Sequence, residues 1–172
     1  GHLDEAPVEQ AHAWMLPAWR ILKAVRKPGE SVAIPTWLYG HEPTSPLATH
    51  IAKYFQNSIR EDGLLTVATH GVIYAEGRAG TLQEIFQDAN QNFYRLFGHF
   101  SPMTFYGGDF WTKQIPAVPE LQALFPPEDF ARYVLVTDDP EAIVAFLVHH
   151  RDPETPSERL GRYIENKEVR RG

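Results

Sequence analysis

The sequence predicts a mixed α/β fold in which helices cover both faces of a parallel sheet. Its 172 residues are 43% apolar, which is enough for one buried core. Four short apolar runs, each bounded by turn residues, have the length of buried strands. They lie at 31–34, 71–75, 103–106 and 133–136. Helix-length segments separate them, and this alternation is typical of parallel strands joined by helical crossovers.

The segment before the first strand predicts a helix over residues 3–28, because its apolar residues recur at helical spacing. Pro17 should break or kink this helix, and the Pro28-Gly29 pair should end it. We therefore expect a helical arm over residues 1–30, followed by an α/β domain over residues 31–150.

A loop over residues 35–46 follows the first strand and ends in a helix start. Ser45-Pro46 combines a capping hydroxyl with a proline at the first helical position. The helix should continue until Gly63 weakens or ends it. Its inner face would carry Leu47, Ile51, Tyr54, Phe55 and Ile59.

The second strand, 71–75, leads through a glycine-bearing turn at 76–81 into a helix whose inner face reaches Leu96. A proline-rich helical stretch is expected between the third and fourth strands, and Asp139-Pro140 opens a last helix. Ligands of such sheets bind beyond the carboxyl ends of the strands.

Residues 151–172 differ in composition, because half of them are charged. We interpret them as a solvated tail. The alternative is one weakly docked helix through Leu160, Tyr163 and Ile164.

The composition excludes several classes of function. Without cysteine there is no disulfide scaffold, thiolate metal site or thiol nucleophile, and a reducing, cytoplasmic location fits. The formal charge of -6 argues against a nucleic-acid partner, although a small anion could bind a local positive site. No apolar stretch is long enough to span a membrane, so we expect a soluble protein.

The turn between the second strand and its helix is the strongest candidate for chemistry. Gly77 and Gly80 would let the backbone approach a ligand, and the exposed helix amides would suit a phosphate. Thr81 and Glu84 have the spacing of a capping box, which would occupy the Glu84 carboxylate. Otherwise Glu84 would face the ligand as an acid, a base or a hydroxyl-orienting group.

Other polar residues give weaker signals. Arg60 is either a solvated charge paired with Glu61 or Asp62, or a cation that neutralises a phosphate across the pocket. The histidines do not have metal-ligand spacing, so neither a metal nor a cofactor is expected. No Gly-x-Ser-x-Gly nucleophile elbow occurs, which leaves acyl transfer without support.

The stretch Glu76-Gly77-Arg78-Ala79-Gly80-Thr81-Leu82-Gln83-Glu84 resembles the Pro-Gly-Gly-x-Gly-Thr-x-x-Glu signature of the LONELY GUY (LOG) family. The resemblance covers about residues 31–148. It implies a Rossmann-like sheet and hydrolysis of nucleoside 5'-monophosphates to free base and ribose 5-phosphate. It also implies that Glu84 and Arg60 are catalytic, and that Gly77, Arg78, Gly80 and Thr81 bind the phosphate.

The chain departs from the family pattern in two places. Within the signature, Glu76 replaces the proline and Arg78 replaces the second glycine, so Arg78 would add positive charge beside the phosphate and Glu76 would oppose it. The family's upstream Gly-Gly-Gly-x-x-Gly loop does not occur before residue 31. The chain therefore resembles the C-terminal half to two-thirds of a LOG-type domain. The sheet edge that this would expose predicts dimerisation, a partner segment or poor stability, and of these we expect a homodimer.

Two function hypotheses follow from these residues. The first is a hydrolase that cleaves the N-glycosidic bond of a nucleoside monophosphate, with Glu84 stabilising the oxocarbenium-like state. The second is a non-catalytic nucleotide-sensing or assembly module in which Glu84 is only half of a capping box.

Overall fold

The computed structural model describes residues 8–37, 45–151, 154, 157, 158, 161, 162 and 164. The first residues of the predicted N-terminal helix and most of the loop over 35–46 lie outside this part of the chain, as do Leu160 and Tyr163 of the predicted docking helix. The chain forms two compact units, residues 1–62 and 63–172, which are described separately below.

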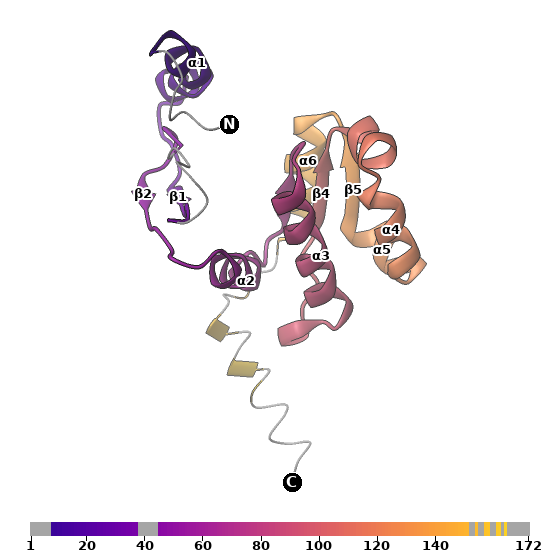
Figure 1. Ribbon diagram of the computed structural model, residues 1–172. Coiled ribbons are helices and arrows are strands. Elements are labelled where there is room, and N and C mark those ends of the chain that lie inside the picture. Colours follow the sequence, from indigo (N-terminus) through magenta and orange to yellow (C-terminus); the bar gives the residue numbers. More distant parts are fainter. Residues whose placement is uncertain are drawn as a thin grey trace. The chain divides into compact units, whose positions relative to one another are not determined.

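The first unit contains one long helix and a small parallel sheet (Figure 1). Helix α1, Val8–Ala24, passes through Pro17, so the predicted break within the helix is not found. Strand β1, Val32–Ala33, pairs in parallel with β2, His50–Ile51. Helix α2, Asn57–Val67, begins in this unit.

The helix predicted from Ser45-Pro46 is wrong, because this stretch pairs with the first strand instead. The backbone N–H of Thr49 donates to Ser31 O at 2.8 Å, and the Thr49 hydroxyl donates to the same carbonyl at 2.9 Å. The Ser31 N–H in turn donates to Thr49 Oγ1 at 2.9 Å. These partners fix an extended backbone here, so the helix begins only at Asn57. The prediction that the first strand is buried on both faces is also wrong, since Val32 is 57% exposed.

The second unit is built on a parallel sheet of three strands in the order β3-β4-β5. Strand β3 is Val72–Tyr74, β4 is Met103–Tyr106 and β5 is Val134–Thr137, which confirms the strands predicted near these positions. Tyr74 lies beside Phe105, and Phe105 lies beside Val136. The molecule is therefore a mixed α/β protein with small parallel sheets.

Helices connect these strands, and some were not predicted. The helices near Leu82, Leu121 and Ile143 are confirmed. A π-helical turn after β4 and a short helix before β5 are additional. In chain order the helical elements are α3 (Ala79–Phe93), η1 (Leu96–Gly98), η2 (Phe110–Gln114), α4 (Ala117–Leu124), α5 (Pro127–Tyr133) and α6 (Pro140–His149).

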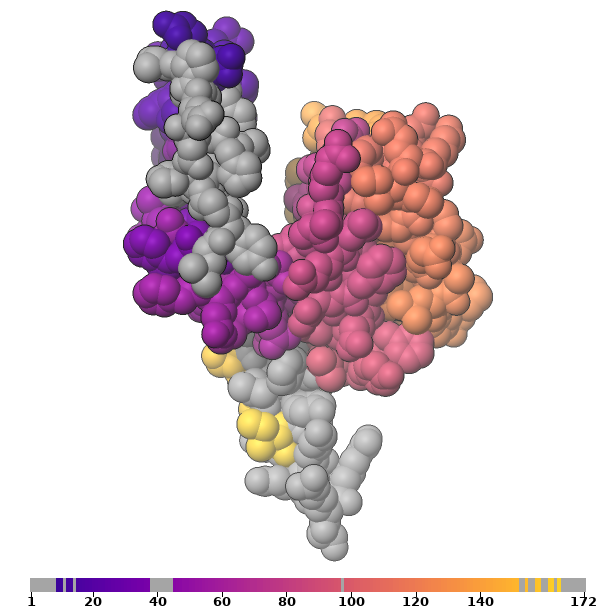
Figure 2. Space-filling model, viewed as in Figure 1, coloured from indigo at the N-terminus to yellow at the C-terminus, as the bar shows by residue number. Residues whose placement is uncertain are grey.

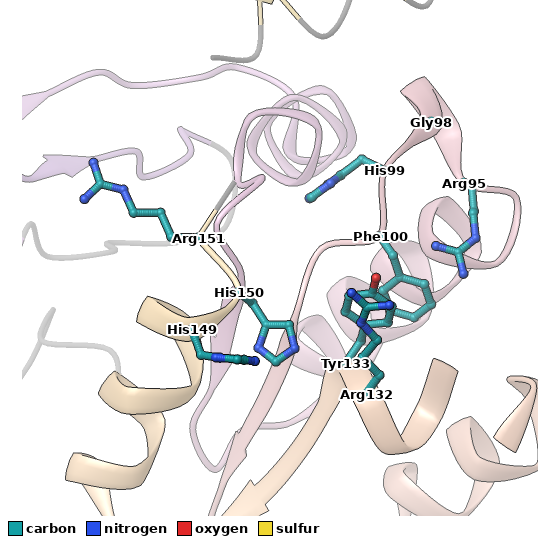
Figure 3. Close-up of a pocket in the computed structure, with 9 residues that line it drawn as sticks. All are labelled: Arg95, Gly98, His99, Phe100, Arg132, Tyr133, His149, His150 and Arg151. Atoms are coloured by element: carbon teal, nitrogen blue, oxygen red, sulfur yellow. The ribbon is translucent and has the colours of Figure 1, made fainter. Parts of the chain in front are cut away.

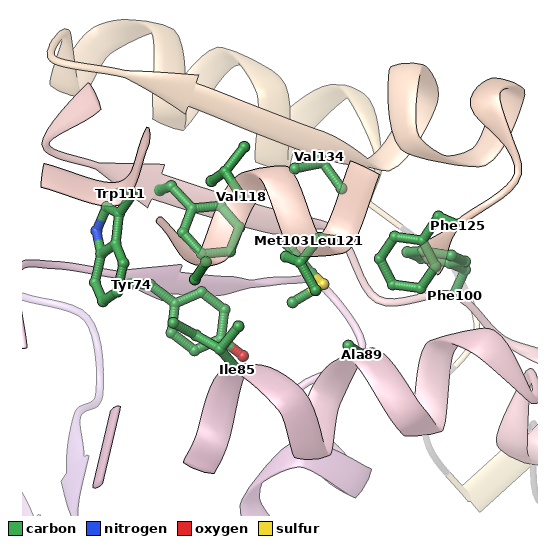
Figure 4. Packing of buried hydrophobic residues seen from close by; sticks show 12 residues of the cluster. Tyr74, Ile85, Ala89, Phe100, Met103, Trp111, Val118, Leu121, Phe125 and Val134 are labelled. Atoms are coloured by element: carbon green, nitrogen blue, oxygen red, sulfur yellow. The ribbon is translucent and has the colours of Figure 1, made fainter. Parts of the chain in front are cut away.

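The main core lies between one face of this sheet and helices α3 and α4 (Figure 4). Met103 and Phe105 of β4 point to this face and are fully buried. Ile85 of α3 and Leu121 of α4 cover them, and Trp111 of η2 closes the end of the cluster. The indole N–H of Trp111 donates to Tyr106 O at 3.1 Å, so this buried polar atom is satisfied.

Helix α6 packs against β5 and contributes Ile143, a buried residue outside the main cluster. Asp139 caps its start by accepting a hydrogen bond from the Glu141 N–H at 3.0 Å, as the Asp139-Pro140 pair predicted. The elements of this unit form one continuous body in the space-filling view (Figure 2). None of the helices in the described part of the chain is both long and apolar enough to cross a membrane.

Candidate functional site

The carboxyl ends of β3, β4 and β5 meet at one edge of the sheet, because the three strands are parallel. The residues that follow them, 75–78, 107–109 and 138–139, lie at this edge. The Gly108 N–H donates to Asp138 Oδ1 at 2.9 Å, which ties the end of β4 to the end of β5. This is the place where ligands of parallel sheets bind.

Gly77 is required by the close packing of the turn between β3 and α3. A Cβ atom placed on Gly77 would lie 2.1 Å from Thr81 Oγ1 and 2.6 Å from Thr81 Cβ. The Thr81 side chain therefore turns back against the loop. Gly80 differs, because a Cβ atom there would meet nothing within 4 Å.

The start of α3 contradicts the predicted capping box. The helix begins at Ala79 with Arg78 as its N-cap, and the Arg78 side chain makes no capping hydrogen bond. Thr81 lies inside the first turn, so it cannot cap the helix together with Glu84. The first intrahelical bond runs from Leu82 N to Arg78 O. The amides of the three residues before Leu82 therefore point out of the helix end, where they can bind an anion.

Glu84 is half-buried on α3, one turn before the buried Asp88. Burial and the Asp88 charge raise the pKa of Tyr74, and the Glu84 charge raises it further. Glu84 therefore lies close enough to the Tyr74 hydroxyl, at the end of β3, for their charges to interact. A carboxylate near this strand end can act as an acid or a base on a ligand at the turn.

A buried polar network that was not predicted holds α3 against the sheet. The Tyr74 hydroxyl donates to Asp88 Oδ2 at 2.8 Å, and the Asn92 side-chain amide donates to Asp88 Oδ1 at 3.1 Å. Asn92 also accepts a hydrogen bond from the Ser101 N–H at 2.6 Å. Burial raises the pKa of the Asp88 carboxyl to about 7, although the hydrogen bonds from Tyr74 and Asn92 lower it.

Arg60 belongs to the first unit, whereas the other predicted site residues belong to the second. Its guanidinium donates to Ile34 O at 3.3 Å and lies 3.7 Å from the Glu61 carboxylate. Of the six predicted site residues, the structure brings together Gly77, Arg78, Gly80, Thr81 and Glu84 at the start of α3.

Charges of both signs surround the strand ends. Arg78 adds a positive charge to the loop, whereas Glu76 and Asp138 add negative ones. A Cβ atom on Gly107, where φ is +99°, would lie 3.2 Å from Glu76 Cγ, so the Glu76 side chain covers the end of β4. An anion at this edge would depend mainly on the helix amides.

Sequence reasoning missed Gly107, Gly108 and Asp138 as parts of this edge, although the order of strands and turns contained the signal. Each lies within two residues of the end of an apolar run, and parallel strands bring such positions together. Within the described part of the chain, no group of three or more His, Asp or Glu side chains is placed to hold a metal ion.

No protein-family model matches the chain, and the search of curated proteins found no match.

Proposed function

We propose that this protein hydrolyses the N-glycosidic bond of a nucleoside 5'-monophosphate, using a Rossmann-like site of the LOG type. The observation that supports it best is the start of α3. The helix begins at Ala79 without a side-chain cap, and Glu84 is not part of a capping box. Uncapped amides, which would hold an anion, and a carboxylate thus occur together on the first turns of one helix.

The 5'-phosphate would bind the amides that point out of the start of α3. Gly80 leaves open space beside them, because nothing lies within 4 Å of its Cβ position. Gly77 lets the loop pack directly on Thr81. Arg78 would offset part of the phosphate charge, while the backbone amides supply directed donors.

Glu84 would hold the ribose hydroxyls and stabilise the oxocarbenium-like state that forms as the bond between C1' and the base breaks. Water then adds to C1', and the leaving base takes up a proton. We assign Arg60 either to binding of the phosphate or to support of the Glu84 carboxylate. This assignment is supported only by its match to the family pattern. The homodimer, expected from an exposed sheet edge, likewise stays a prediction.

The test is release of free adenine from AMP, followed by chromatography. Glu84→Gln should lower the rate at least about 100-fold while AMP still binds, because the amide keeps the shape but loses the charge. Glu120→Gln, the same change at an exposed residue of α4, is the matched control and should keep the parent rate. Unchanged turnover in Glu84→Gln would remove this residue from the mechanism.

One observation favours the second hypothesis, a nucleotide-sensing or assembly module without catalysis. Glu76 stands where the family has proline, and its side chain covers Gly107 at the ligand edge. A negative charge there opposes a phosphate dianion and could retune the site for binding alone. AMP that stabilises the protein against heat without releasing adenine would identify such a module, and neither effect would argue against both hypotheses.

A further inference from the structure

A second candidate site lies at the other end of the sheet, near the amino ends of β4 and β5 (Figure 3). It is a cavity of about 440 Å³ in the second unit. Phe100, shortly before β4, and Tyr133, directly before β5, form part of its wall. The volume suits a small molecule, because ligand pockets of proteins are commonly about 300–1,000 Å³.

The cavity wall is rich in groups that can carry positive charge. Three arginines and three histidines line it, and none of its lining residues is acidic. They are Arg95, Arg132, Arg151, His99, His149 and His150. Since the whole chain has a formal charge of -6, this is a local concentration of cations against the overall balance.

Aromatic rings hold two of the guanidinium groups in place. Phe100 and Tyr133 stack with their centroids 4.6 Å apart. The Arg95 guanidinium lies 5.3 Å from the Phe100 centroid, and that of Arg132 lies 5.1 Å from the Tyr133 centroid. Asp129 also pairs with Arg95 at 2.6 Å. Preorganised guanidinium groups lose less entropy when they bind a ligand.

Two of the histidine rings are oriented by backbone carbonyls. His150 Nδ1 lies 2.9 Å from Phe146 O, and His99 Nε2 lies 2.7 Å from Thr69 O. A carbonyl oxygen only accepts, so each of these nitrogens carries a proton. These bonds fix the direction in which each ring presents its other nitrogen.

We propose that this cavity binds a small oligophosphate, a ligand with two or more linked phosphate groups. The arginines come from three places along the chain, after α3, on α5 and after α6, and they border the cavity from different sides (Figure 3). Guanidinium groups match pairs of phosphate oxygens, and no carboxylate pairs with Arg132 or Arg151 among the described residues. This inference does not depend on the proposed hydrolase activity.

The experiment is calorimetric titration of the full chain with pyrophosphate and tripolyphosphate. Both should bind, tripolyphosphate more tightly, and affinity should fall as salt rises because exposed charges are screened. Arg132→Ala and Arg151→Ala should each weaken binding by at least about tenfold. Arg132→Lys should also weaken it, since the charge remains but the planar fork is lost.

A control variant removes a positive charge at the opposite end of the sheet. Lys113→Ala changes an exposed residue of η2 that pairs with Asp109, and it should keep pyrophosphate binding. Arg78→Ala changes the loop before α3 and tests whether the ligand binds there instead. Loss of binding in Arg78→Ala but not in Arg132→Ala would overturn the proposal, because the ligand would then bind the strand-end loop. Absence of binding at millimolar pyrophosphate would overturn it as well.

Titration with ADP distinguishes a ligand recognised by its linked phosphates alone from a nucleoside diphosphate. ADP that binds like pyrophosphate indicates that the linked phosphates alone are recognised. ADP that binds much more tightly indicates a nucleoside diphosphate, with the nucleoside also in contact with the cavity. Arg132 and Arg151 are exposed, so circular dichroism and thermal unfolding should show intact variants.

Discussion

Asp88 should make the free energy of unfolding of the second unit depend on pH. In the Asp88→Asn variant this contribution to the pH dependence should disappear. Its carboxyl is buried at 1% exposure, and burial raises its pKa from the ordinary 3.8 to about 7. A raised pKa means that the folded state holds the proton more tightly than the unfolded chain does. The stabilisation is therefore complete below pH 3.8 and is lost as pH rises to about 7.

The size of the effect follows from the pKa difference. The pKa rises by about three units, and each unit corresponds to roughly 1.4 kcal/mol. The free energy of unfolding of the parent should therefore fall by about 4 kcal/mol between pH 4 and pH 7. Asp88→Asn keeps the shape of the protonated side chain and cannot ionise. The free energy of unfolding of the variant, measured relative to that of the parent, should therefore rise by about 4 kcal/mol over this pH range.

The assay is urea unfolding of parent and variant at several pH values from 4 to 7.5, followed by tryptophan fluorescence, to which the fully buried Trp111 is the contributor from the second unit. Asp109→Asn, the same change at an exposed carboxylate, serves as the control and should keep the parent's pH dependence. A difference between Asp88→Asn and the parent that stays constant with pH would refute the reasoning. Asp88 would then be ionised in the folded protein throughout this range.

Three glycines should respond differently to replacement by alanine, because their surroundings differ. Gly77→Ala should lower the free energy of unfolding by about 1–3 kcal/mol, since its Cβ would meet Thr81 Oγ1 at 2.1 Å. Gly80→Ala should instead raise the free energy of unfolding by up to about 1 kcal/mol, because the position is helical and open. If Gly77→Ala and Gly80→Ala had equal effects in thermal unfolding, this turn geometry would be wrong. Gly71→Ala should cost at least about 2 kcal/mol, because φ is +127° and its Cβ would lie 2.4 Å from Leu147 Cδ2, and a variant as stable as the parent would contradict this backbone.

The second unit was largely predictable because local signals and tertiary partners agree there. Each strand is an apolar run that is followed within three residues by glycine or aspartate, and the helix after Asp139 begins where a cap and a proline occur together. The segment after Ser45 was not predictable in this way. Its apolar residues fit a helical period, but Thr49 bonds to Ser31, a partner 18 residues earlier. A periodicity count cannot detect such a partner.

The residues of the candidate site could be predicted from the sequence, but the way in which the helix start is capped could not. The glycines and Glu84 stand out in the sequence, yet Thr81-x-x-Glu84 spacing also fits a cap, and only the observed start at Ala79 decides between the two. The Asp88 network was hidden for a similar reason. Its partners Tyr74 and Ser101 come from other elements, so their meeting depends on how α3 packs on the sheet.

The two ends of this sheet offer an anion different kinds of attraction. At the strand-end loop, Arg78 is offset by Glu76, so the helix amides provide most of the attraction. Amides are uncharged dipoles that act over one turn and favour a single, well-placed phosphate. The opposite cavity depends on side-chain cations with no acidic residue in its lining, and such attraction grows with ligand charge and weakens with salt. Monophosphates should therefore favour the first end and linked phosphates the second, which is why AMP and pyrophosphate serve as separate probes.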